Sequence, residues 1–216
     1  MEKKIAKLIS LLDNAYPKAR IALHFRDPVQ LLVATILSAQ CTDARVNIVT
    51  EQLFKKYRTV QDYAHADIRA FEQDIRSTGF YHNKAKNIIA AAQMIVHDFA
   101  GKVPDSMEAL VRLPGVARKT ANIVLYNAFG KIEGIAVDTH VRRLSQRLGL
   151  SPHDDPEKIE QDLMRQIDKK LWGHVTYLLV EHGRAVCDAK KPKCRACVVA
   201  SLCPAKKAFS GGEGGE

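Results

Sequence analysis

The chain has 216 residues, 46% of them apolar, which is enough material to bury a core in one large domain or two small ones. Its 33 Lys and Arg residues outnumber 24 Asp and Glu residues, and the formal charge of +9 favours a polyanionic partner, nucleic acid first. A basic protein without such a partner is the alternative on charge alone. No apolar run is long enough for a membrane span or a signal peptide, so we expect a cytoplasmic protein without a membrane partner.

Helical periodicity runs along almost the whole chain and no segment shows the alternation typical of a strand, so we expect an all-α fold. Local start signals include Asp27-Pro28, Thr42 or Asp43, the capping box Thr59–Asp62, and Asp67. The other expected helices cover Ile5–Leu12, Tyr81–Phe99, Ser106–Arg112, Arg118–Phe129, Asp138–Leu148, a segment from Asp155-Pro156, and Leu171–His182. Four of them are expected to end at Gly101, Gly130, Gly149 and Gly183. The Gly- and Glu-rich residues 210–216 are expected to form a disordered tail.

The segment Leu113–Ala121 predicts a short helix, a tight hairpin and a second helix. Gly115 lets the main chain approach a ligand closely, and the N–H groups that begin the second helix suit a phosphate oxygen. The structural alternative is an ordinary turn between helices. The sequence therefore offers an anion site, with Arg118 and Lys119 beside it.

Lys119 would lie in the first turn of that second helix, where the positive end of the helix dipole favours a neutral, nucleophilic amine. A solvated or phosphate-contacting lysine is the alternative. Asp138 follows 19 residues later and is placed to cap a helix, but a carboxylate near an amine also accepts a proton or stabilises a developing cation.

Four cysteines close the chain in the pattern C-x6-C-x2-C-x5-C, namely Cys187, Cys194, Cys197 and Cys203. We interpret them as one metal site, because a chain of this size with no export signal needs no disulfides. Zinc and an iron–sulfur cluster both accept four thiolates. A single C-x2-C with unequal flanking arms favours a [4Fe-4S] cluster over zinc. The fifth cysteine, Cys41, is expected to be a small core residue.

Basic residues flank the cysteines, and we expect the metal site to hold this basic loop, with Lys191 and Lys193, against phosphates. A solvated charged face is the alternative.

Three motifs in order, Leu113–Ala121, Ala136–Val141 and the cysteine loop, resemble those of endonuclease III, a helix-hairpin-helix DNA glycosylase and lyase family, over roughly residues 5–204. The resemblance implies a two-lobed fold with a six-helix barrel lobe at 21–133. Residues 1–20 and 134–209 would form an iron–sulfur cluster lobe. It also implies a monomer, associated with the nucleoid, that acts on double-stranded DNA containing damaged pyrimidines or abasic sites.

In this family the lysine that matches Lys119 attacks C1′ of the damaged nucleoside, and the aspartate that matches Asp138 assists loss of the base. The resulting Schiff base undergoes β-elimination, which cuts the strand 3′ to the lesion. The resemblance assigns Gln40 and Phe80 to the gap left by the extruded nucleotide. It assigns main-chain N–H groups near Gly115 and Ala117 to phosphate contact.

Two positions depart from the family pattern: Phe80 replaces the usual leucine wedge, and Ala117 replaces a second hairpin glycine. An aromatic ring at 80 should stack rather than plug the gap. If position 117 requires a positive φ, alanine there costs roughly 1 kcal/mol and tilts the phosphate site.

Three functions are consistent with the sequence: a glycosylase with lyase activity, a glycosylase without it, and a DNA-binding module with a structural metal. The adenine-removing relatives would carry a catalytic glutamate before Gln40, and residues 31–38 contain no carboxylate. The first function makes the most use of Lys119 and Asp138, so we expect a base-excision glycosylase and lyase.

Overall fold

The computed structural model describes residues 2–210, and within this range the chain is all-helical, with no strand. Its contacts divide it into two compact units, one of residues 22–133 and one that joins the chain before residue 22 to the chain from residue 134 onward. The expected disordered tail, 210–216, lies outside the described residues except for Ser210, which ends a helix. No helix in the described range has the length and apolar character needed to cross a bilayer.

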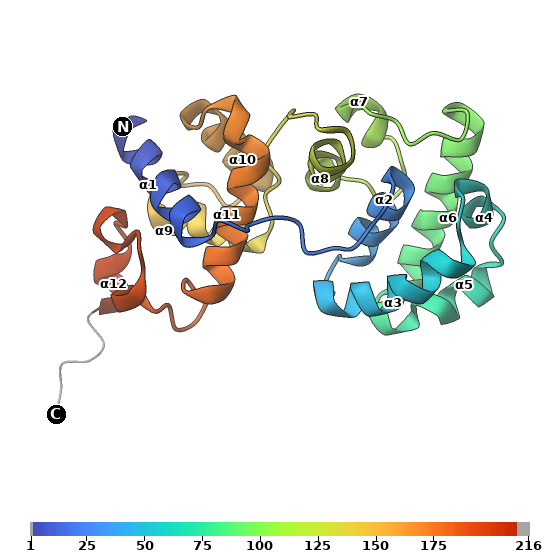
Figure 1. Cartoon of the computed structure of the whole chain (residues 1–216), viewed down its shortest axis with the longest axis horizontal. Helices are drawn as coiled ribbons and strands as arrows, with labels where there is room; N and C mark the ends of the chain where they lie inside the picture. Colours follow the sequence, from blue (N-terminus) through green and yellow to red (C-terminus); the bar gives the residue numbers. More distant parts are fainter. Residues whose placement is uncertain (1, 211–216) are drawn as a thin grey trace. The chain divides into compact units, whose positions relative to one another are not determined.

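The unit of residues 22–133 is built from seven α-helices and one short 3-10 helix (Figure 1). These are α2 (Pro28–Leu37), α3 (Asp43–Lys56), α4 (Val60–Ala64), α5 (Ile68–Ile75), η1 (Arg76–Thr78), α6 (Tyr81–Asp98), α7 (Met107–Leu110) and α8 (Arg118–Phe129).

Helix α2 is the buried centre of this unit and packs against α3, α6 and α8. Every residue from Leu31 to Leu37 is buried, which explains why this helix is apolar all round. Asp27 begins it as predicted, since its carboxylate accepts a hydrogen bond from the Gln30 amide at 2.9 Å and Pro28 follows at the first helical position. The capping box Thr59–Asp62 is also confirmed, at the start of α4.

The second unit contains the remaining helices (Figure 1). These are α1 (Glu2–Ala15), α9 (Thr139–Leu148), α10 (Pro156–Gln166), η2 (Lys169–Leu171), α11 (Trp172–Ala185), η3 (Cys194–Ala196), η4 (Ala200–Leu202) and α12 (Lys206–Ser210). Helix α11 packs against α1 and α9, and α10 packs against α9. Buried side chains from these helices, including Leu8, Leu144, Leu163 and Leu178, form one core.

The predicted end of α11 at Gly183 is wrong, because the helix continues to Ala185. Gly183 serves a different purpose. A Cβ atom there would lie 2.8 Å from His140 Nδ1 and 3.0 Å from an Arg143 nitrogen, so only glycine lets α9 approach α11 this closely.

The expectation that Cys41 is a core residue is also wrong. It follows the end of α2 and is only half-buried.

Candidate functional site

The hairpin before α8 turns at Gly115, whose φ of +78° lies in the left-handed region. A Cβ atom at this position would lie 2.9 Å from the Cβ of Asn87 on α6, so glycine is required by both backbone conformation and space. The concern about Ala117 is removed, because its φ of −92° belongs to ordinary extended backbone. Alanine therefore introduces no left-handed strain in the hairpin.

Helix α8 begins at Arg118, and Lys119 follows in its first turn, half-buried. The N-cap is Ala117, which offers no side-chain acceptor, and the first turn contains no acidic residue. Among the α-helices of residues 22–133, only α6 and α8 begin without a side-chain cap. A helix start without a side-chain cap is a suitable place for an external anion.

Gln40 and Phe80 share an unusual backbone conformation, with φ values of 52° and 48°. Both side chains are exposed, Phe80 to 63% of its surface. Gln40 follows the end of α2, and Phe80 stands immediately before α6. Left-handed conformations are uncommon outside glycine and cost conformational free energy, and Ala100, with a φ of 51°, is the third such residue in the described chain.

The first turns of α6 bring three sequence-predicted elements together. Lys84 Nζ donates one hydrogen bond to the Leu37 carbonyl, before Gln40, and one to the Thr78 carbonyl, before Phe80, both at 2.8 Å. Asn87, one helical turn further on, packs against Gly115. Sequence reasoning missed Lys84 and Asn87. The available signal for Lys84 was a lysine in register with the apolar positions Ile88 and Ile95.

Asp138 belongs to the other unit, where it is the half-buried N-cap of α9. Its carboxylate accepts a hydrogen bond from the Val141 amide at 2.8 Å, so the capping role is confirmed. The preceding segment is held by Thr176 on α11, whose hydroxyl donates to the Ala136 carbonyl at 3.2 Å. One carboxylate oxygen of Asp138 is engaged in the cap, and a carboxylate has further lone pairs for a second function.

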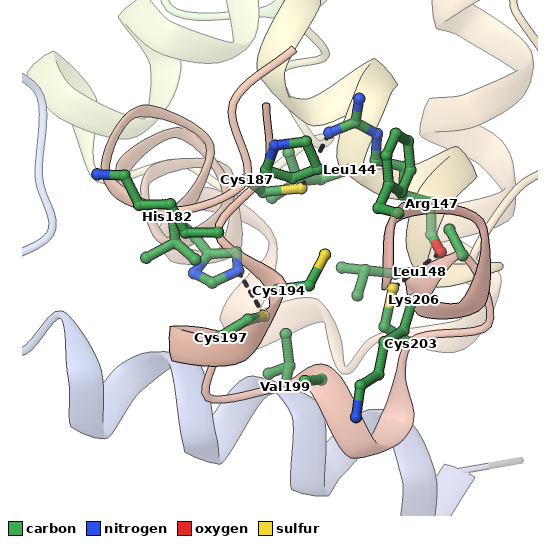
Figure 2. A pocket seen from close by; sticks show the side chains of 16 residues that line it. Leu144, Arg147, Leu148, His182, Cys187, Cys194, Cys197, Val199, Cys203 and Lys206 are labelled. Atoms are coloured by element: carbon green, nitrogen blue, oxygen red, sulfur yellow. Dashed lines mark hydrogen bonds between the residues drawn. The ribbon is translucent and has the colours of Figure 1, made fainter. Parts of the chain in front are cut away.

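The four cysteines of the C-x6-C-x2-C-x5-C pattern lie around one hollow in the second unit. Figure 2 shows their labelled side chains entering it from different sides, with Leu144, Leu148 and Val199 among its other walls. Burial raises the pKa of the thiols of Cys197 and Cys203, so the apolar wall favours their neutral forms. Within the described chain, no three His, Cys, Asp or Glu side chains gather closely enough to hold a single metal ion.

Polar groups lie beside three of the four sulfurs, and Cys203 Sγ donates to the Arg147 carbonyl at 3.3 Å. Arg147 donates to Cys187 Sγ at 3.3 Å and to the carbonyls of Asp188 and Ala189, both at 2.7 Å. His182 is 1% exposed, its Nε2 lies 3.3 Å from Cys197 Sγ, and its Nδ1 lies 2.9 Å from the Tyr16 hydroxyl. Burial lowers the pKa of His182, which keeps the ring neutral. Arg147 is thus a charged donor to one of the four sulfurs.

The basic residues predicted to face phosphates, Lys191 and Lys193, are exposed in this loop. Asp188 shapes it by accepting hydrogen bonds from the amides of Lys190 and Lys191, at 2.8 and 3.1 Å. The Lys191 and Lys190 amides also hold the pKa of Asp188 below its usual range. The loop is therefore a structured turn that carries exposed cations.

Comparison with known proteins gives a consistent result. Residues 33–169 match the HhH-GPD superfamily of base excision DNA repair proteins. The chain is 52% identical to endonuclease III of Synechocystis sp. over 96% of its own length and 94% of the relative, and 45% identical to that of Bacillus subtilis over 93% and 92%.

The fold is also similar to solved structures. A trapped covalent intermediate of endonuclease III with DNA has a TM-score of 0.92 at 42% identity, covering 96% of this chain and 98% of that one. A non-covalent endonuclease III–DNA complex has the same score and identity. The chain therefore belongs to the endonuclease III family within the HhH-GPD superfamily of base excision DNA repair proteins, and it is a DNA glycosylase/lyase of that family.

Proposed function

We propose that the protein removes oxidised pyrimidines from double-stranded DNA and cleaves the strand at the resulting abasic site through a Schiff base on Lys119. The observation that carries this proposal is the position of Lys119 in the first turn of α8, a helix that begins without a side-chain cap behind the Gly115 hairpin. A similar chain was trapped as a covalent intermediate with DNA, which supports a covalent step here.

The chemistry starts from the neutral amine of Lys119. It attacks C1′, the bond from C1′ to the base breaks, and the departing base takes up a proton. Loss of the amine proton and opening of the sugar ring give an imine, with the ring oxygen leaving as a hydroxyl group. Removal of a C2′ proton then breaks the C3′–O bond, and water hydrolyses the imine to restore Lys119. Asp138 would stabilise the cationic sugar and accept a proton.

Phosphates of the duplex would contact the main chain near Gly115 and Ala117 and the side chain of Arg118. The start of α8 supports this placement, since its N-cap, Ala117, makes no side-chain hydrogen bond to the first turn. Lys191 and Lys193 would contact phosphates from the other unit. We further infer that residues 21–133, which contain the seven helices α2 to α8, form the barrel lobe, and that residues 1–20 and 134–209 form the cluster lobe of a monomeric enzyme.

A panel of duplexes, each with a single lesion, tests the reaction. We expect release of ring-saturated or oxidised pyrimidines together with a strand end that carries the unsaturated aldehyde of β-elimination. Undamaged duplex of the same sequence is the control. Base release without strand cleavage would identify a glycosylase that lacks lyase activity. The absence of both base release and strand cleavage would indicate a DNA-binding module.

We also propose that Cys187, Cys194, Cys197 and Cys203 hold a [4Fe-4S] cluster. The residues present fit such a group, because four thiols surround one hollow, Arg147 donates to Cys187 Sγ, and His182 Nε2 lies 3.3 Å from Cys197 Sγ. When bound, the cluster would cross-link the basic loop and keep Lys191 and Lys193 in place.

Protein purified without oxygen is expected to absorb broadly near about 400 nm, as iron–sulfide charge transfer does. Cys197→Ala is expected to lose this band, whereas Cys41→Ala, which removes a thiol from the other unit, is expected to keep it. Metal analysis by mass spectrometry accompanies both spectra. A colourless preparation that contains zinc would contradict the cluster assignment.

A further inference from the structure

Lys84 is a buried cation that the proposed chemistry does not use. It lies in the first turn of α6 and is 4% exposed. Its Nζ donates to two main-chain carbonyls, those of Leu37 and Thr78, both at 2.8 Å. Burying an ammonium group is costly unless acceptors replace its hydration, so these carbonyls account for its presence on the apolar face of α6.

The two carbonyls belong to segments far apart in sequence. Leu37 is the last residue of α2, three positions before Gln40, and Thr78 is the last residue of η1, two positions before Phe80. The bond to Leu37 spans 47 positions along the chain and the bond to Thr78 spans six. One ammonium group therefore joins the start of the Gln40 loop to the start of the Phe80 loop (Figure 1 labels α2, which precedes the first loop, and α6, which follows the second).

Both loops carry strain at their exposed residues. Positive φ values outside glycine occur at three described positions, and two of them are Gln40 and Phe80. Such conformations persist only where the surrounding structure holds them. The chain thus presents two strained, exposed side chains from loops that share one buried anchor.

We propose that Lys84 is a positioning residue that sets the Gln40 and Phe80 loops in register, so that both side chains enter the gap in the duplex as one unit. This inference rests on the proposed function, in which those two side chains occupy the space of the extruded nucleotide. Lys84 touches no DNA in this role. It lowers the ordering needed on binding, because the loops are joined before DNA arrives.

Lys84→Met keeps the length and apolar stem of the side chain but removes the ammonium group. We expect it to weaken binding to a duplex with a tetrahydrofuran abasic analogue by about tenfold, the scale of a lost hydrogen bond from a charged donor. Binding to the undamaged duplex is expected to change less than about twofold, because that affinity comes from exposed cations. Equal weakening on both duplexes would overturn the proposal.

Lys55→Met is the matched control. Lys55 lies on α3 in the same unit, is exposed, and pairs with Glu51 at 3.4 Å. Its substitution by Met removes the same charge without altering a contact to either loop. A 2-aminopurine placed opposite the abasic analogue reports the gap directly. Its fluorescence change on binding is expected to shrink for Lys84→Met and to match the wild type for Lys55→Met.

A double-mutant cycle tests whether Lys84 acts through the loops. Gln40→Ala and Phe80→Ala are each expected to cost less abasic-site affinity in the Lys84→Met background than in the wild type. Fully additive effects would show that Lys84 acts elsewhere. If circular dichroism shows that Lys84→Met does not fold, a double-mutant cycle between Gln40→Ala and Phe80→Ala replaces the cycle with Lys84→Met. Additive losses of abasic-site affinity in that cycle would contradict a shared anchor.

The outcome is separable from that of the proposed function. Binding to the abasic analogue involves no Schiff base, since this analogue has no C1′ leaving group. Failure of wild-type protein to cleave a true abasic site would refute the lyase reaction and leave the binding comparison of Lys84→Met intact.

Discussion

Lys119→Ala is expected to lower strand cleavage at an abasic site by at least about a thousandfold, because no other group at this position can form the imine. Affinity for the abasic duplex is expected to fall by less than about tenfold, since the main-chain amides of the hairpin and α8 are kept. Single-turnover cleavage and equilibrium binding measured on the same duplex separate the two effects.

Lys119→Arg provides the matched control for charge. It keeps a cation in the first turn of α8 but has no nucleophilic amine. We expect binding close to that of the wild type and cleavage as low as in Lys119→Ala. Cleavage by Lys119→Arg at the wild-type rate would reduce Lys119 to a phosphate contact.

Asp138→Asn is expected to lower release of an oxidised pyrimidine by about a hundredfold or more, the usual scale for loss of an acid–base group. Asparagine still caps a helix, so the hydrogen bond from the Val141 amide and the thermal stability should be largely retained. The variant therefore isolates the charge of Asp138 from its structural role. Base release is measured in a single turnover with a lesion duplex.

Asp155→Asn is the control for this substitution. Asp155 caps α10 in the same unit and accepts hydrogen bonds from the amides of Glu157 and Lys158. The same change at this second cap should leave base release unaltered. Equal activity of Asp138→Asn and Asp155→Asn would make Asp138 only a helix cap.

Most helix starts were predictable from sequence because capping is local chemistry. Asp27, Asp138 and the Thr59–Asp62 box each satisfy amides within three residues, so the sequence contains the whole interaction. The end of α11 was not predictable in this way. Gly183 is readily seen in the sequence, but glycine is required there because His140 and Arg143 of α9 lie close to its Cα. This long-range contact cannot be deduced from a local pattern.

The residues of the candidate site were likewise predictable where they belong to local motifs and not where they depend on long-range contacts. Motifs identified Lys119, Asp138 and the four cysteines, because each belongs to a short pattern of residues. The role of Lys84 was not predictable from a motif, because it depends on a long-range hydrogen bond to a carbonyl 47 positions away. Every residue type has a main-chain carbonyl, so the sequence does not show which carbonyl accepts the hydrogen bond. The one signal in the sequence is a lysine among the apolar positions of α6.

The claim on which the mechanism depends is a covalent bond between Lys119 and C1′. Borohydride reduction of the wild-type protein with an abasic duplex, followed by proteolysis and mass spectrometry, measures this bond directly. We predict a nucleotide adduct on the peptide that contains Lys119 and no adduct in Lys119→Ala. An adduct on another lysine, or undiminished trapping in Lys119→Ala, would contradict the account.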